Sequence, residues 1–239
     1  MPTVQPAAAR PAALAKHPML AGADPAALER LARHAVWRLV ELDGTVLEFG
    51  DPSAEVFFVF DGLLRVQLRT ADGQEMILND IGANGVFGEL AAIDGAPRSA
   101  SISALHRTQL CMVPGPLFLE CVLASPVVAL RLMRMLVARL RGKDEQVLEL
   151  ATLPVRKRLM AELLRLSRPR ADGSGQRVVS PPPPHHVLGA RIGARREAVS
   201  REISSLVRAG WVEADRRAIR LRKPEALHRE LDGHLPRAQ

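Results

Sequence analysis

Aromatic residues are scarce in this chain of 239 residues: they make up 3% of it, and tyrosine is absent. Proteins that stack single-stranded bases on aromatic side chains need more of them, so the sequence argues against that class of nucleic-acid binder. No apolar run reaches about 18 residues, and the sequence therefore predicts no transmembrane helix. The hydrophobic content of 47% and the charged content of 25% are typical of a globular protein.

Cysteine and histidine are also few. Cys111 and Cys121 cannot form a disulfide framework or a metal site, and they suit a reducing cytoplasm as small buried apolar residues, with redox sensing as the alternative. The predicted strand region holds one histidine, His106, while His185 and His186 adjoin a proline run, so a metal site of two histidines and a carboxylate cannot be built. No Ser-His-Asp signature, phosphate-binding loop or paired-cysteine zinc motif is present, and we expect no enzyme.

The N-terminal half changes from a tail to a strand-rich region. Residues 1–15 are rich in alanine and proline and lack the apolar core of a secretory signal, so we expect residues 1–20 to be a disordered tail. Asp24-Pro25 predicts the start of a helix. Further on, Ala71-Asp-Gly-Gln74 predicts a hairpin turn. Short apolar runs separated by Gly and Asp predict strands at 45–49, 56–60, 63–69, 76–79, 101–103 and 109–113.

A long helix is predicted over Val127–Leu150. Its apolar positions follow spacings of four and three, which is the pattern of a coiled-coil seam. The seam positions are Ala129, Met133, Leu136, Leu140, Lys143, Val147 and Leu150. Periodicity alone leaves a dimer seam and a core-facing helix equally open. Pro154 ends the helix and predicts a hinge before the next one, over 155–168.

Positive charge is confined to the C-terminal end. Residues 154–239 hold 19 Arg and Lys against 9 Asp and Glu, a net charge of +10, whereas residues 1–153 carry −3. A basic excess in one segment is typical of a module that meets duplex phosphates. Residues 168–175 have the composition of a loop, and Pro181–Pro184 is rigid and non-helical.

A helix-turn-helix is predicted over residues 187–206, with Gly193 at the turn. The second helix places Val199, Ile203 and Leu206 on one face, which leaves other positions to meet base edges. Arginine can bond bidentately to guanine and glutamate can accept from cytosine. The candidates for DNA contact are Arg195, Arg196, Glu197, Ser200 and Arg201. Solvated salt bridges such as Glu197–Arg201 are the alternative. Residues 211–221 predict a two-stranded wing.

The most informative run is Phe87-Gly-Glu-Leu-Ala-Ala-Ile-Asp-Gly-Ala-Pro-Arg-Ser-Ala100. Gly88 allows close backbone approach before a short helix that begins near Leu90, and the N–H groups of such a helix attract anions. Arg98 and Ser99 add donors suited to a phosphate. Glu89 can only accept, so the ligand must also present a hydroxyl. In a 3′,5′-cyclic nucleotide the ribose 2′-OH is that group. An ordinary Glu89–Arg98 salt bridge is the alternative.

This run resembles the phosphate-binding cassette of the cyclic-AMP receptor protein/FNR (CRP/FNR) family of bacterial regulators, and residues 44–51, 57–62 and 71–74 resemble that family's β-roll. The string Arg196-Glu-Ala-Val-Ser-Arg201 is similar to its recognition-helix signature. The resemblance covers about residues 20 to 230. It implies an α+β fold in which a jelly-roll-like β-roll that binds a cyclic nucleotide precedes a long dimerisation helix and a winged helix-turn-helix.

The resemblance divides the chain into a β-roll at 21–126, a dimerisation helix and hinge at 127–153, and a DNA-binding domain at 154–239. It implies a cytoplasmic homodimer that binds double-stranded DNA at two half-sites of TGTGA type, read by Arg196, Glu197 and Arg201. RNA polymerase is a further implied partner, and no membrane is expected. Without an N-terminal cysteine cluster, FNR-type iron–sulfur sensing is excluded.

The chain departs from the family at the base-contacting positions. Two adjacent hydroxyl residues on the dimer helix contact adenine in the family's cyclic-AMP sensors, and the aligned residues here are Lys143 and Asp144. Asp144 could accept from the amino group of adenine, or twice from guanine, so cyclic AMP is the expected ligand and cyclic GMP stays open. A regulator that binds DNA without a nucleotide, or that senses another effector, is the alternative function.

Overall fold

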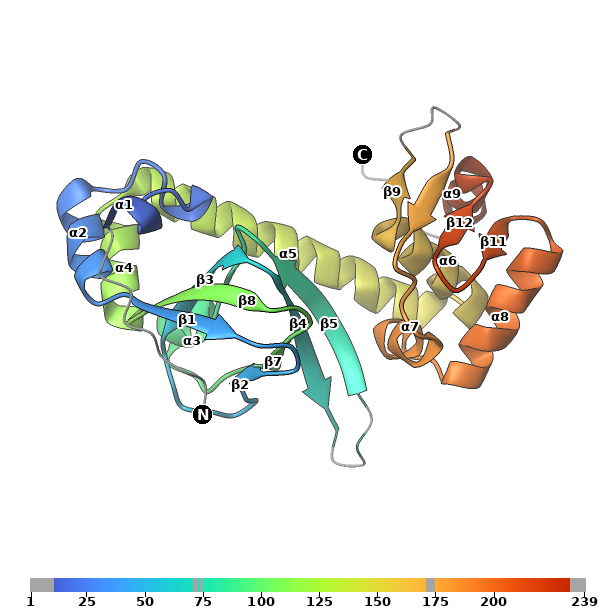
Figure 1. The fold of residues 1–239 in the computed structure, drawn as a ribbon, viewed down its shortest axis with the longest axis horizontal. Coiled ribbons are helices and arrows are strands. Elements are labelled where there is room, and N and C mark those ends of the chain that lie inside the picture. Colours follow the sequence, from blue (N-terminus) through green and yellow to red (C-terminus); the bar gives the residue numbers. More distant parts are fainter. Residues whose placement is uncertain (1–10, 71–72, 74, 171–174, 233–239) are drawn as a thin grey trace. The chain divides into compact units, whose positions relative to one another are not determined.

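A computed structural model describes residues 11–70, 73, 75–170 and 175–232 of the chain (Figure 1). The chain divides into two compact units, Met1–Arg139 and Leu140–Gln239. Each unit has its own buried apolar core.

The N-terminal unit is built on two four-stranded antiparallel sheets, with strand orders β1-β8-β3-β6 and β2-β7-β4-β5. Their bounds are β1 Val36–Val40, β2 Thr45–Leu47, β3 Val56–Asp61, β4 Leu63–Arg69, β5 Glu75–Gly82, β6 Val86–Phe87, β7 Ser101–Ala104 and β8 Thr108–Val113. Side chains such as Phe57, Leu64 and Leu110 fill the core that both sheets share. The predicted strands are present, while β1 and β6 are additions. Strands β4 and β5 form the predicted hairpin, but Ala71, Asp72 and Gln74 of its turn lie outside the described residues.

Helices cover the other face of the β1-containing sheet (Figure 1). They are α1 Pro11–Leu14, the 3₁₀ helix η1 Pro18–Leu20, α2 Pro25–Arg33, α4 Gly115–Leu123 and the first part of α5 Pro126–Thr152. The predicted start of α2 is confirmed, because the Asp24 side chain accepts a hydrogen bond from the backbone N–H of Ala27.

The prediction of a disordered tail through residue 20 is wrong for residues 11–20. Leu14, Met19 and Leu20 are buried in the helical core of the N-terminal unit. The guanidinium of Arg131 on α5 donates to the backbone oxygens of Met19 and Ala21 and so fastens the segment. Burial of these apolar side chains stabilises a segment whose alanine and proline content indicates no fold by itself.

The C-terminal unit packs helices against a small antiparallel sheet of order β11-β12-β10-β9. Its elements are α6 Val155–Leu166, β9 Arg168–Pro169, β10 Arg177–Val179, α7 His185–Ile192, α8 Arg196–Arg208, β11 Val212–Ala214, β12 Ile219–Leu221 and α9 Pro224–Asp232. The predicted helix-turn-helix and the two strands of the wing are confirmed. The wing belongs to a larger sheet than predicted, since β9 falls in the predicted loop, of which residues 171–174 lie outside the described residues. Helix α9 is a further addition.

Helix α5 confirms the long helix and ends before Leu153-Pro154, as predicted. The predicted seam is wrong at two positions, because Ala129 and Leu136 pack against the core of the N-terminal unit. Met133, Leu140, Val147 and Leu150 of the predicted seam are exposed, as are the large apolar side chains of Leu130 and Val137. The exposed positions from Leu130 to Val147, with Asp144 included, are spaced by three and four residues and share Met133, Leu140 and Val147 with the predicted seam, so periodicity could not tell which neighbouring positions the core covers. No single helix in the described part of the chain is long and apolar enough to cross a membrane; the bent pair α4 and α5 meets that criterion only when taken together.

Candidate functional sites

The cassette begins with a left-handed turn at Gly88, which has a φ of 81°. A Cβ there would lie 2.6 Å from the backbone oxygen of Glu55 and 2.9 Å from Nη1 of Arg98, so only glycine fits. Helix α3, Glu89–Asp94, follows as predicted and ends at Gly95. The turn therefore places the first residue of α3 beside Arg98.

Glu89 is the buried acid of this site. Glu89 is 1% exposed, and its Oε1 accepts a hydrogen bond of 2.6 Å from Nη1 of Arg139 on α5. The other nitrogen of the Arg139 fork donates to the backbone oxygen of Val86 at 2.6 Å. Glu89 Oε2 is buried and makes no hydrogen bond to the described residues. Burial raises the pKa of the Glu89 carboxyl, and the charge of Arg139 opposes that rise.

Arg98 is the buried cation of this site, and 3% of its surface is exposed. Its guanidinium donates three hydrogen bonds of 2.9 Å: from Nε to Ser53 Oγ, from Nη1 to the backbone oxygen of Gly88 and from Nη2 to that of Glu55. The alternative interpretation, an ordinary Glu89–Arg98 salt bridge, is therefore wrong, because Glu89 pairs with Arg139 and Arg98 with Glu55. Sequence reasoning missed Ser53, Glu55 and Arg139, because nothing in their local patterns connects them to residues 87–100.

The remaining predicted ligand contacts differ in their surroundings. Leu90 is 45% exposed on α3, and Ser99 is exposed next to Arg98. Lys143 and Asp144 lie on the part of α5 that belongs to the C-terminal unit. There Lys143 Nζ donates to Oε1 of Gln146 at 2.9 Å, and burial followed by the charge of Arg165 lowers the Lys143 pKa. Asp144 is exposed.

The predicted reader is the pair α7 and α8. Gly193 ends α7 with a φ of 61°, and at Gly189 a Cβ would lie 2.4 Å from the backbone oxygen of Ala194, so the turn needs both glycines. Helix α8 buries Val199, Ile203 and Leu206, and this division into a packed side and an exposed side was predicted. The exposed candidates for DNA contact are Arg195, Arg196, Glu197 and Arg201.

Ser200 differs from the other candidates. It is half-buried, and its hydroxyl lies 2.7 Å from Nδ1 of His185 at the start of α7. This hydrogen bond joins the two helices of the reader. Ser200 therefore helps to fix the angle between α7 and α8, and a DNA contact by the same hydroxyl stays a prediction.

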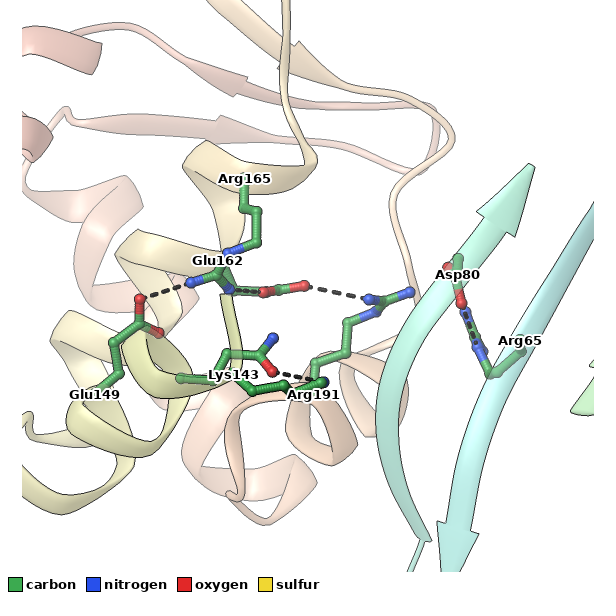
Figure 2. A network of polar contacts seen from close by, with 8 residues as sticks. Arg65, Asp80, Lys143, Glu149, Glu162, Arg165 and Arg191 are labelled. Atoms are coloured by element: carbon green, nitrogen blue, oxygen red, sulfur yellow. Dashed lines mark hydrogen bonds and ion pairs between the residues drawn. The ribbon is translucent and has the colours of Figure 1, made fainter. Parts of the chain in front are cut away.

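An ion-pair network holds the reader to the helices before it (Figure 2). Glu162 on α6 is 2% exposed and lies between Arg165 and Arg191, the latter on α7 at 3.5 Å. Arg165 also donates to Glu149, in the last turns of α5, at 2.6 Å. Side chains on three helices are thus joined by ion pairs whose carboxylates are largely withdrawn from water, while Arg165 is 40% exposed.

Two family models match the chain. Residues 38–125 match the cyclic nucleotide-binding domain, and residues 157–230 match the Crp-like helix-turn-helix domain. The cassette lies within the first match and α7–α8 within the second.

Curated relatives that the chain matches over most of its length include a transcriptional regulator. The chain is 29% identical over 210 residues to the cyclic AMP receptor protein of Thermus thermophilus, covering 88% of this chain and 94% of the relative. It is 23% identical over 217 residues to the CRP-like cAMP-activated global transcriptional regulator of Mycobacterium tuberculosis, covering 90% and 97%.

Solved structures share the fold. FixK2 from Bradyrhizobium japonicum superposes with a TM-score of 0.70 at 23% identity, covering 86% of this chain and 99% of that one. The c-di-GMP responsive global regulator CLP from Xanthomonas campestris gives a TM-score of 0.69 at 21% identity, covering 82% and 98%.

Proposed function

Because the chain belongs to the CRP/FNR family of transcriptional regulators, with a cyclic nucleotide-binding domain and a Crp-like helix-turn-helix, we propose that a cyclic nucleotide controls its binding to DNA. The ligand is cyclic AMP, with cyclic GMP as the second candidate. The nucleotide shifts an equilibrium between two arrangements of a homodimer, and one of them fits a palindromic DNA site.

The observation that carries the sensor proposal is the carboxylate of Glu89. One of its oxygens is held by Arg139, while the other is buried and free of hydrogen bonds to described residues. A buried acceptor without a donor costs about 1–3 kcal/mol, which a ligand hydroxyl would recover. The ribose 2′-OH of a cyclic nucleotide supplies that donor, and Arg98 and Ser99 would meet its phosphate.

The exposed side of α8 supports the DNA proposal. Arg196, Glu197 and Arg201 are exposed on a helix whose opposite side is packed into the core. We assign to them the reading of a TGTGA-type half-site, with Arg195 and Ser200 as further contacts. The net charge of +10 over residues 154–239 would attract the phosphates of both DNA strands.

The exposed stripe of α5 supports the homodimer. Leu130, Met133, Val137, Leu140 and Val147 present apolar side chains to water at coiled-coil spacing. A second copy of the helix would bury them. Two readers related by a twofold axis would then meet two half-sites about one helical turn apart. In such a dimer we assign contacts with the nucleotide base to Lys143 and Asp144.

The full chain should be titrated by calorimetry with cyclic AMP, cyclic GMP and, as the control, 5′-AMP. We expect heat with a cyclic nucleotide and little with 5′-AMP. Ser99→Ala should weaken binding because the hydroxyl donor is lost, and Arg98→Leu should abolish it. Since Arg98 is buried, circular dichroism must first show that Arg98→Leu folds. No heat with either cyclic nucleotide would refute the sensor.

Fluorescence anisotropy with a duplex that carries two TGTGA half-sites tests the second half of the proposal. Cyclic nucleotide should tighten binding at fixed salt. One alternative is a regulator that binds DNA without a nucleotide. It is favoured because the Arg98 guanidinium already donates hydrogen bonds to groups of the protein, which a phosphate would have to displace. Equal affinity with and without nucleotide would establish that alternative. A DNA-bound regulator would work in the cytoplasm with RNA polymerase as its partner.

A further inference from the structure

Glu55 supplies Arg98 with two acceptors from the residue that precedes β3. Its backbone oxygen accepts from Nη2 at 2.9 Å, and its Oε2 lies 3.5 Å from the same nitrogen. Arg98 is itself buried, whereas the Glu55 side chain is 40% exposed. The direct ion-pair partner of the buried Arg98 is therefore a carboxylate whose side chain reaches solvent.

The other acceptors of Arg98 are more firmly held. Gly88 contributes a backbone oxygen just before α3, and Ser53 contributes its side-chain hydroxyl. The backbone N–H of Ser53 in turn donates to Oδ1 of Asp51 at 2.7 Å. The backbone of Asp51 accepts from the N–H of Arg98 at 2.9 Å, so the loop and the cassette are tied together. The Glu55 carboxylate can leave Arg98 by a side-chain rotation, without any change in this backbone.

The charge around Arg98 opposes a second anion. Glu55, Asp51 and Glu89 all act on the guanidinium. Hydrogen bonds from the backbone and side chain of Ser53 lower the pKa of Asp51 and keep it ionised, and Glu89 is paired with Arg139. Among these carboxylates, Glu55 combines a direct ion pair to Arg98 with an exposed side chain.

We propose that the Glu55 carboxylate is an internal competitor for the phosphate at Arg98 and makes the pocket select singly charged cyclic phosphodiesters over doubly charged phosphate monoesters. The proposal rests on the sensor function above. A cyclic nucleotide carries one negative charge on its phosphate, while 5′-AMP carries close to two above pH 7. Repulsion by Glu55 is proportional to that charge, so it penalises the monoester twice as strongly in free energy.

Glu55→Gln tests this because it removes the charge and keeps the shape. At pH 8 and low salt, calorimetry should show that the variant binds cyclic AMP about three- to tenfold more tightly. This is the gain expected when repulsion between one carboxylate and one singly charged phosphate is removed from a partly solvated site. Binding of 5′-AMP should tighten about ten- to a hundredfold, the square of that factor. Both gains should shrink as salt is added.

Glu48→Gln is the matched control. Glu48 is exposed just before the same loop and makes no ion pair with Arg98 in the described part of the chain, so its variant should bind both nucleotides as the wild type does. Unchanged or weaker binding by Glu55→Gln would overturn the competition, and equal gains for both ligands would overturn the charge selection. If wild type and variants alike bind no cyclic nucleotide, the sensor function itself fails.

Discussion

Replacing Arg165 by methionine is expected to destabilise the C-terminal unit, because it breaks the ion-pair network between α5, α6 and α7. The Glu162 side chain is 3% exposed and that of Glu149 is 11% exposed. Without Arg165, each of these nearly buried carboxylates would lose an ion-pair partner that water replaces poorly. Removing one partner of a buried pair costs about 3–5 kcal/mol. Arg165 is itself 40% exposed and Arg191 remains near Glu162, so we expect a smaller loss of about 2–3 kcal/mol.

The unfolding of this unit can be followed separately from that of the other. The two tryptophans lie in different units, so in a Trp37→Phe background the fluorescence of Trp211 reports on the C-terminal unit alone. Trp211 packs against that unit's core, and its emission should change on unfolding. For a unit of about 100 residues, the expected loss lowers the melting temperature by about 10 °C or more.

Arg220→Met is the control for loss of an arginine. Arg220 donates to Asp215 at 2.7 Å, nearly the length of the Arg165–Glu149 bond, but Asp215 is 45% exposed. Water can replace this partner, so we expect no resolvable shift in the melting temperature. Equal shifts for Arg165→Met and Arg220→Met, or none for either, would refute the argument that burial gives the network its strength.

Three further changes have defined outcomes. Burial lowers the pKa of His17 to about 4, so the N-terminal unit should lose about 3 kcal/mol of stability as the pH falls from 6.5 to 4. His17→Asn should flatten that loss in urea unfolding followed by the fluorescence of Trp37 in a Trp211→Phe background, and an unchanged pH dependence would contradict it. Arg196→Ala should cost roughly 1–3 kcal/mol of DNA affinity and relax one base position, and uniform weakening on all sequences would show a phosphate contact instead. Val137→Glu on the exposed stripe should yield monomers in sedimentation, and an intact dimer would exclude that stripe as the interface.

Patterns within a few residues were sufficient to predict much of the fold. Asp24-Pro25 starts α2, Gly193 ends α7, and Pro154 separates α5 from α6, because capping, turns and proline act on neighbouring backbone. The short helix after Gly88 was predicted for the same reason. The packed side of α8 followed from its periodicity, since helical spacing alone decides which residues share a face.

Contacts between distant parts of the chain could not be predicted in this way. Arg139 reaches Glu89 across 50 residues of sequence, and Glu55 reaches Arg98 across 43. No local pattern distinguishes these charged residues from solvated ones. The stripe of α5 that is left exposed was likewise decided by which face the N-terminal core covers.

The sequence by itself thus determined where helices begin and end and which face of α8 is packed, because capping, turns and periodicity act over a few turns; its resemblance to the family added the order of the two parts, the cassette and the helix-turn-helix. Tertiary structure alone decided which charges meet. It pairs Glu89 with Arg139 and brings Arg98 within hydrogen-bond distance of Ser53 and Glu55. It also buries Glu162 beside Arg165. Those pairings depend on the path of the whole chain, since burial makes a charge take whichever partner the fold brings within hydrogen-bond distance.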